Sequence, residues 1–136
     1  MSKILLVESD AMALSELASA LRQQRFQIKT HRDLLDGMRE LAWFSAKVMV
    51  WAPHPNDPAR ASKFKKVKNY RKYTPLFVID DDRSPYGEPH DESTFVYSTQ
   101  EPVANIVQQI LSITGVPTAA LQYEDDEERE TIEENA

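Results

Sequence analysis

Acidic side chains gather where two apolar segments of this chain end. Glu8 and Asp10 follow the apolar run at 4–7, and the three consecutive aspartates 80–82 follow the run at 76–79. Carboxylates that meet at strand ends are the oxygen ligands that hard cations such as Mg²⁺ prefer. The same pattern is typical of loop acids that water solvates, which is the commoner state of these side chains. We predict solvated acids and no metal site.

A basic segment precedes the aspartates. From 60 to 72 it contains no acid, and its cations are Arg60, Lys63, Lys65, Lys66, Lys68, Arg71 and Lys72. On a helix these side chains form a positive surface, which could serve only solubility or could bind nucleic acid, anionic lipid headgroups, a nucleotide or an acidic protein. Among binding partners we expect an acidic protein surface. The chain's own acidic tail is one such surface, and salt would weaken that contact.

The net charge of -6 is unevenly distributed. Residues 124–136 carry eight acids and one arginine, a net charge of -7, which leaves +1 for residues 1–123. We predict one domain over residues 1–118, and an acidic tail or linker over 119–136 that is disordered or an extended helix. Because the domain is nearly neutral and the tail is acidic, we do not expect binding to nucleic acid.

Several chemistries are excluded by composition. The chain has no cysteine, so disulfides, thiolate metal sites and a cysteine nucleophile are excluded. His31, His54 and His90 lie far apart without ligand spacing, and we interpret them as loop histidines. The apolar runs are too short to span a membrane, and the first residues do not form a signal peptide. We therefore expect a cytoplasmic protein.

Five short apolar segments predict β-strands, at residues 3–7, 27–30, 47–51, 76–79 and 95–97. The central runs are continuous rather than alternating, which is typical of strands covered on both faces. Helical segments alternate with the strands, which favours right-handed crossovers and a parallel sheet. We predict an α/β fold of the flavodoxin-like class, a (βα)5 three-layer sandwich with strand order 2-1-3-4-5.

The helices follow from apolar residues at helical spacing. Ser9 or Asp10 is placed to cap the first helix, and Asp33 to cap the second. The last helix begins at Pro102. The third helix, 59–72, is expected to bury three residues: Ala61, Phe64 and Val67.

The segment between the fourth and fifth strands is poor material for a helix. It contains Pro85, Gly87 and Pro89, so we predict that the fourth helix of the fold is lost or shortened. Tyr86 lies among them. The segment is either a recognition element that exposes Tyr86 or a shortened connection, and the sequence leaves both open.

Four segments, KILLVESD, VMVWAP, PLFVID and FVYSTQEP, resemble in order and spacing the receiver domain of bacterial two-component response regulators, over residues 2–114. The resemblance implies an aspartate that accepts a phosphoryl group at the end of the third strand, and a magnesium ion held partly by two acids after the first strand. The acceptor position falls here on Ala52. The acid pair reads Glu8-Ser9, and we assign Asp10 to the helix cap.

Two further positions of the implied pocket are altered. The hydroxyl residue that ends the fourth strand corresponds to Asp80, whose charge would repel a phosphoryl group. The lysine after the fifth strand falls on Ser98 and Thr99. The sequence therefore predicts a degenerate phosphorylation pocket with no catalytic residue and no cofactor.

We predict a pseudo-receiver, a phosphorylation-independent signalling module that docks protein partners and is not an enzyme. It could stand alone or precede a C-terminal effector domain. A homodimer is compatible with this prediction, but phosphate-gated dimerisation is not expected. The alternative is a divergent receiver that binds a metal or accepts phosphate through Asp57 or Asp80. A flavin-binding domain of the same strand order is disfavoured, because no Ser, Thr or Gly run follows the first strand to hold a phosphate.

Overall fold

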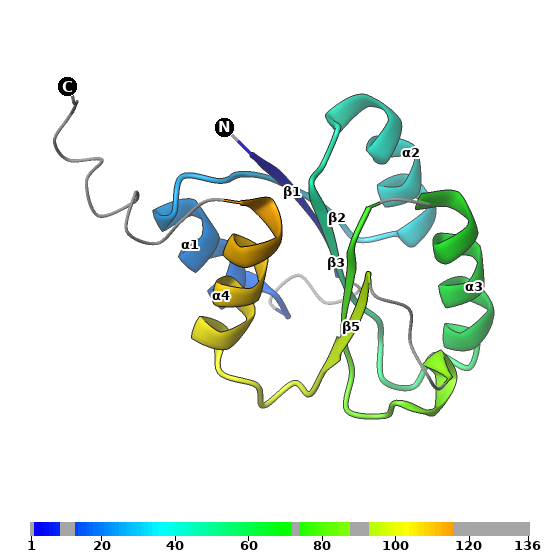
Figure 1. Ribbon diagram of the computed structural model, residues 1–136. Coiled ribbons are helices and arrows are strands. Elements are labelled where there is room, and N and C mark those ends of the chain that lie inside the picture. The colour runs from blue at the N-terminus through cyan, green and yellow to red at the C-terminus, as the bar shows by residue number, and fades with distance from the viewer. Residues whose placement is uncertain (1, 9–12, 72–73, 88–92, 116–136) are drawn as a thin grey trace, which may run out of the picture.

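The computed structural model describes residues 2–8, 13–71, 74–87 and 93–115 (Figure 1). Its elements are, in chain order, β1 (Lys3–Glu8), α1 (Ser15–Gln23), β2 (Gln27–His31), α2 (Leu34–Phe44), β3 (Val48–Ala52), α3 (Arg60–Arg71), β4 (Leu76–Ile79), the 3-10 turn η1 (Ser84–Tyr86), β5 (Thr94–Tyr97) and α4 (Val103–Thr114). Strands and helices alternate as the sequence predicts.

The five strands form one parallel sheet in the order β2-β1-β3-β4-β5, which confirms the predicted topology. Residues 3–7 of β1 pair with 27–31 of β2, and residues 4–8 of β1 pair with 48–52 of β3. The central strands β1 and β3 are buried along almost their whole length. Their continuous apolar runs are therefore explained by cover on both faces.

Helices cover both faces of the sheet. Figure 1 shows α1 and α4 on one face and α2 and α3 on the other. The side chains of each strand alternate between the two cores, so that Leu6 and Val50 pack under α1 and α4, and Leu5 and Met49 pack under α2 and α3. The result is the predicted three-layer sandwich.

Helix α2 lies very close to β1. A Cβ atom added at Gly37 would come within 2.5 Å of Val7 Cγ2, so only glycine permits this approach. The helix begins as predicted, because the Asp33 side chain accepts a hydrogen bond from the Asp36 amide at 3.4 Å.

The predicted start of α1 was wrong. The helix begins at Ser15, and its N-cap residue Leu14 makes no side-chain capping bond. Ser9 and Asp10, which we expected to cap the helix, lie outside the described residues. Glu8 contacts this end of the helix instead, because its Oε1 accepts a hydrogen bond from the amide of the N-cap residue Leu14 at 2.9 Å.

The predicted inner face of α3 needs a correction at one position. Phe64 and Val67 are buried as expected, but Ala61 is exposed. Residues four and seven positions apart share one side of a helix, so Arg60 lies on the same side as Phe64 and Val67. The side chain of Arg60, only 14% exposed, therefore takes the inward place expected for Ala61.

The fourth helix of the predicted fold is reduced to one 3-10 turn. Between β4 and β5 the part of the chain that the structure describes contains η1 and no α-helix, while residues 88–92 lie outside it. The acidic tail, 119–136, also lies outside the described residues. Within the described ranges, none of the helices has the length and apolar character needed to cross a bilayer.

Candidate functional site

The candidate site lies at the edge of the sheet where the strands end, which we call the carboxyl edge. In open parallel sheets ligands bind outside this edge. Glu8 ends β1, Ala52 ends β3, Asp80 follows β4 and Ser98 follows β5. The fold thus brings together the predicted pocket residues from all four strands, apart from Ser9 and Asp10, which are not described.

The end of β3 is part of the hydrophobic core. Ala52 is 6% exposed, pairs in register with Glu8 of β1 and packs into the core under α1 and α4. Its neighbour Trp51 packs into the opposite core, and Pro53 is buried as well. At the position that would carry an acceptor aspartate, the chain presents a methyl group and no nucleophile.

The end of β1 carries a buried carboxylate. Glu8 is 6% exposed, and its Oε1 accepts the hydrogen bond from the Leu14 amide at the start of α1. A carboxylate there also interacts favourably with the positive end of the helix dipole. The acid that the resemblance assigned to a metal site is engaged in positioning α1.

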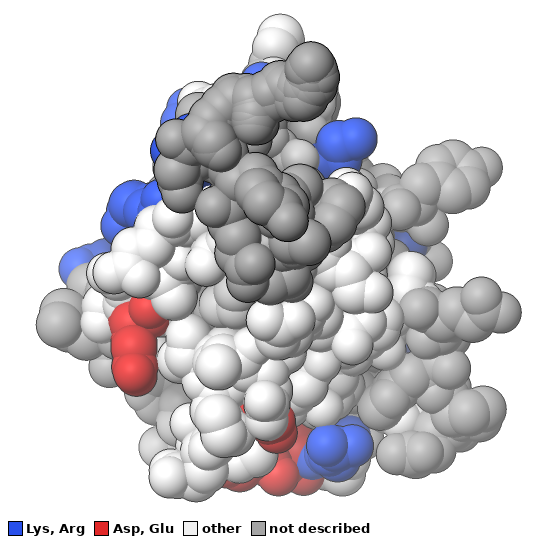
Figure 2. Space-filling model, turned by 60° about the vertical axis from the view of Figure 1, so that its left-hand side comes forward, with Lys and Arg blue, Asp and Glu red and all other residues white. Residues whose placement is uncertain are grey.

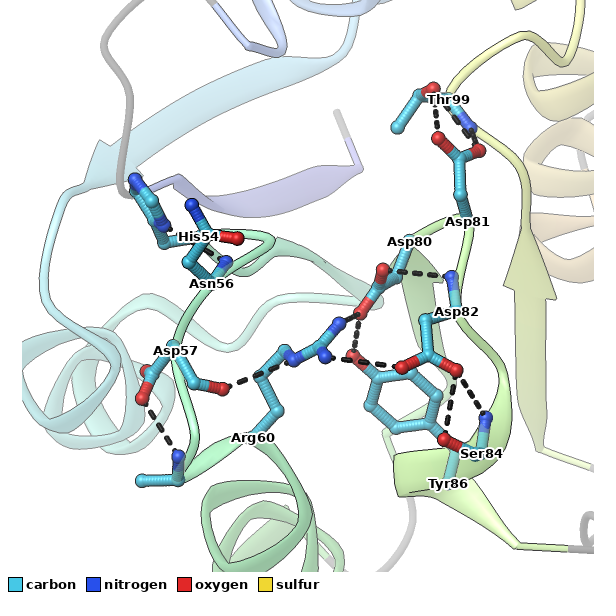
Figure 3. A network of polar contacts seen from close by, with 11 residues as sticks. His54, Asn56, Asp57, Arg60, Asp80, Asp81, Asp82, Ser84, Tyr86 and Thr99 are labelled. Atoms are coloured by element: carbon cyan, nitrogen blue, oxygen red, sulfur yellow. Dashed lines mark hydrogen bonds and ion pairs between the residues drawn. The ribbon is translucent and has the colours of Figure 1, made fainter.

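A buried carboxylate follows β4 and forms an ion pair with a mostly buried arginine (Figure 3). Asp80 is 5% exposed, and its Oδ2 lies 2.6 Å from Nη1 of Arg60. Its Oδ1 accepts a hydrogen bond from the Asp82 amide at 3.1 Å. The hydrogen bond to Asp80 raises the pKa of the Arg60 guanidinium. The charge expected to repel phosphate is therefore paired inside the fold.

Arg60 is held by several acceptors at once. Its Nη2 donates to Oδ2 of Asp82 at 3.1 Å, and its Nε donates to the backbone carbonyl of Asp57 at 3.1 Å. Asp82 in turn accepts from the backbone and hydroxyl groups of Ser84, which lowers the pKa of its carboxyl. Arg60 thus joins the start of α3 to the segment after β4.

Tyr86 is buried, so of the two interpretations that the sequence left open, the recognition element that exposes Tyr86 is wrong. It is 4% exposed, and its ring packs edge-on against Phe64 at 5.1 Å and Trp51 at 6.2 Å between ring centroids. Its hydroxyl donates a hydrogen bond to Oδ2 of Asp80. Burial, and then the bond to the carboxylate, raise the pKa of the phenol. We call Arg60, Asp80, Asp82 and Tyr86 the Arg60 network.

A second cluster joins the ends of β4 and β5. Asp81 accepts hydrogen bonds from Ser98 Oγ at 2.8 Å, from the Thr99 amide at 2.9 Å and from Thr99 Oγ1 at 2.9 Å. The bond from the Thr99 amide is the main reason that the pKa of Asp81 is lowered. Ser98 and Thr99, where the resemblance implied a lysine, hold an aspartate of the neighbouring segment.

The alternative acceptor Asp57 is also engaged. Its Oδ1 accepts a hydrogen bond from the Ala59 amide at 2.8 Å, and its Oδ2 lies 2.5 Å from Nζ of Lys63. The bond to Lys63 lowers the pKa of its carboxyl most. The Asp57 side chain therefore binds the residue before α3 and a lysine of its first turn, so both carboxylates of the alternative prediction have partners.

An open hollow of about 390 Å³ lies beside these clusters. Its lining is Pro53, Pro55, Arg60, Ile79, Asp80, Asp81, Asp82 and Thr99. Among the described residues, no group of three or more His, Asp or Glu side chains is arranged to hold a metal ion. His31, predicted as a loop residue, instead ends β2, and its Nε2 lies 3.1 Å from Oε1 of Glu40.

The predicted basic surface of α3 is only partly present. Lys65 and Lys66 are exposed, whereas Lys63 pairs with Asp57 and Lys68 lies over the ring of Phe64 at 5.4 Å. Arg60 is turned inward, which corrects its assignment as a contact for a partner. The side chain of Arg71, and all of Lys72, lie outside the described residues.

Reasoning from sequence missed the Arg60 network. The signal was the position of Arg60 four and seven residues before Phe64 and Val67, which puts a cation on the buried side of the helix. A cation placed there needs a buried anion, and Asp80 directly follows the adjacent apolar strand. The pairing could be predicted only by combining two facts: Arg60 lies on the buried side of its helix, and the strand that Asp80 follows is the neighbour of β3 in the sheet.

Comparison with known proteins identifies the fold. No protein-family model matches the chain, and no curated protein matches it by sequence. A receiver domain protein from Clostridium thermocellum matches at a TM-score of 0.69, with 13% identity over 85% of this chain and 95% of that one. An orphan response regulator of H. pylori matches at 0.62, with 13% identity over 82% and 95% of the two chains.

A third match is described as an atypical orphan response regulator with a new phosphorylation-independent regulatory mechanism. It has a TM-score of 0.63 and 14% identity, over 85% of this chain and 97% of that one. At such identities the likeness concerns the fold. The chain has the CheY-like, flavodoxin-like fold of response regulator receiver domains, as the sequence predicted.

Proposed function

We propose that the chain is a pseudo-receiver, a domain that keeps the receiver fold and acts in signalling without accepting a phosphoryl group. The observation that carries this proposal is the end of β3. There the acceptor position is Ala52, a buried residue whose methyl group packs into the core. Alanine has no atom that could form a bond to phosphorus, so transfer at this position has no chemical basis.

The charges around that position support the same proposal. A receiver needs a metal ion to hold the charge of a bound phosphoryl group. In this chain the carboxylates after β4 are bound by the chain's own hydroxyl, amide and guanidinium groups, chiefly Arg60. The atypical orphan regulator described as phosphorylation-independent is a structural precedent for a receiver fold used in this way.

The proposed role is to bind a protein partner, with no catalysis and no cofactor, in the cytoplasm. The partner surface we favour is the exposed part of α3 at Lys65 and Lys66, which suits an acidic protein. A homodimer and a C-terminal effector domain in a longer protein both fit this role.

The phosphate part of the proposal is tested by incubating the protein with a small phosphodonor and Mg²⁺ and measuring its intact mass. We expect no adduct of one phosphoryl group, whereas a receiver with its acceptor aspartate gains one in the same reaction. An adduct that disappears in Asp57→Asn or Asp80→Asn would establish the divergent receiver instead.

The partner part is tested with charge reversal on α3. Lys65→Glu combined with Lys66→Glu should abolish capture of an acidic partner from lysate. The control is Arg32→Glu combined with Arg39→Glu, which makes the same change of net charge at two exposed positions outside α3. Equal capture by both variants and the unchanged protein would contradict this choice of surface.

A further inference from the structure

The acids of the described domain gather at one edge of the sheet, where three arginines, Arg32, Arg60 and Arg83, also lie. Every described acid except Glu40 lies at the carboxyl edge or in the helical turn that follows it: Glu8, Glu16, Asp33, Asp36, Asp57, Asp80, Asp81, Asp82 and Glu101. Glu40 lies in the middle of α2 and pairs with Lys29. The domain is nearly neutral overall, but its acids are concentrated at the carboxyl edge.

The opposite edge, where the strands begin, carries a basic surface. We define the amino-edge patch as Lys3, Arg22, Arg25 and Lys47. Arg22, Arg25 and Lys47 are exposed, and the ammonium group of Lys3 lies over the ring of Phe44 at 5.4 Å. The backbone joins these residues, because the Lys47 amide donates to the Lys3 carbonyl at 2.8 Å and the Arg25 amide donates to the Arg22 carbonyl at 3.0 Å. The Gln27 amide, two residues after Arg25, donates to the carbonyl of Ser2, the neighbour of Lys3, at 2.9 Å.

The side of the molecule that carries α1 and α4 shows this separation. In Figure 2 most basic side chains lie in the upper part of the view and acidic ones at its lower and left margins, with a broad uncharged area between them. The upper part corresponds to the edge where β1 begins in Figure 1. Helix α4 also ends at this edge (Figure 1). Its last residue is Thr114, and Gly115 follows in the left-handed conformation (φ 76°).

The chain continues from this edge into its most acidic segment. Residues 124–136 carry a net charge of -7, and eight residues, 116–123, separate them from Gly115. Eight extended residues reach roughly 27 Å, more than the about 10 Å between one packed layer and the next. The acids can therefore reach the amino-edge patch, and tethering gives them an effective concentration of about millimolar.

We propose that residues 124–136 dock on the amino-edge patch of their own chain. The contact is electrostatic: carboxylates of the tail neutralise the cations at the start of β1, at the start of β3 and after α1. This docking is independent of the proposed function, because the amino-edge patch contains no residue of the carboxyl edge and no residue of α3. It would keep other acidic molecules from the patch until salt or a competitor displaces the tail.

The absence of cysteine from the whole chain makes a direct test simple. Ala136→Cys gives one attachment point for a nitroxide label, whose paramagnetism broadens the amide NMR signals of nearby residues. In about 10 mM salt we expect broadening at Lys3, Arg22 and Lys47 and sharp signals at Asp81 and Ser98. In about 1 M salt, where the Debye length is about 3 Å, the broadening should be lost.

Charge reversal identifies the surface. In the labelled full chain, Arg22→Glu combined with Lys47→Glu should remove the broadening, whereas Lys65→Glu combined with Lys66→Glu, with the same change of net charge, should leave it. The NMR spectrum itself reports that each variant is folded. The proposal is overturned if the broadening shows no preference for the patch, persists in high salt, or is lost only in the α3 variant. Broadening that disappears on dilution would assign the contact to a second copy and also overturn the proposal.

Discussion

The ends of β3 and β4 are neighbours in the sheet but differ in what they bury. β3 ends in an apolar core with Trp51 and Ala52, while β4 ends in a carboxylate that Arg60 neutralises. An apolar end needs only packing, whereas a buried carboxylate needs a cation and hydrogen bonds that satisfy its oxygens. The comparison shows two ways to close a carboxyl edge: the middle strand ends in apolar side chains, and the next strand is followed by a carboxylate that Arg60 of the same chain neutralises.

The largest effect is expected from removing the cation. Arg60→Leu keeps an apolar stem but leaves the carboxylate of Asp80, 5% exposed, without its cation. Breaking a buried pair in this way costs about 3–5 kcal/mol of the free energy of unfolding, measurable by urea denaturation.

Two controls sharpen the interpretation of Arg60→Leu. Arg39→Leu removes an exposed pair with Asp36 and should cost less than about 1 kcal/mol. Arg60→Leu combined with Asp80→Leu removes both charges and should recover part of the loss. Equal stability of Arg60→Leu and Arg39→Leu would show that the pair of Arg60 with Asp80 contributes no more to stability than an exposed ion pair.

The next effect is expected at the end of β3. Ala52→Asp puts a carboxylate where a methyl group packs under α1 and α4, and should lower the free energy of unfolding by about 2–4 kcal/mol. Ala52→Ser, with an uncharged polar group of similar size, should cost less. If Ala52→Asp is as stable as the unchanged protein, the end of β3 is not the closed core described above.

The sequence predicted the end of β3 better than the end of β4. The strands, their order, the loss of the fourth helix and the apolar end of β3 followed from continuous apolar runs and from proline and glycine placement, which are local signals. The Arg60 network joins residues twenty positions apart, and whether Arg60 is solvated or buried depends on tertiary contacts with Asp80 and Tyr86. The interpretation that exposes Tyr86 and the prediction that Ala61 is buried were wrong for this reason.

A smaller effect is expected from the phenol of the network. Tyr86→Phe keeps the ring against Phe64 and Trp51 but removes the hydrogen bond to Asp80. A hydrogen bond to a charged group contributes about 1.5–3 kcal/mol, and the loss should fall at the lower end because Arg60 and the Asp82 amide still bind Asp80. Urea denaturation measures it, and a loss as large as that of Arg60→Leu would contradict this order of contributions.

The smallest effect is expected in the pH dependence of stability. Hydrogen bonds lower the folded-state pKa of Asp81 below the unfolded value of about 3.9, so its contribution is present above that value and is lost as the pH falls through the folded pKa. Asp57 and Asp82 have the same sign. Asp81→Asn should therefore reduce the fall in stability between about pH 4 and about pH 2. If stability falls equally with pH in Asp81→Asn and in the unchanged protein, the cluster between β4 and β5 does not contribute to the pH dependence.

The central claim is that the carboxyl edge is occupied by the chain's own groups, with Arg60 in place of an external cation. Titration with Mg²⁺, followed by the amide NMR signals of Glu8, Ala52, Asp80 and Asp81, tests it most directly. The account predicts no saturable shift of these signals in the unchanged protein. Saturable shifts centred on Glu8 and Asp80 would show a working cation site and contradict the account.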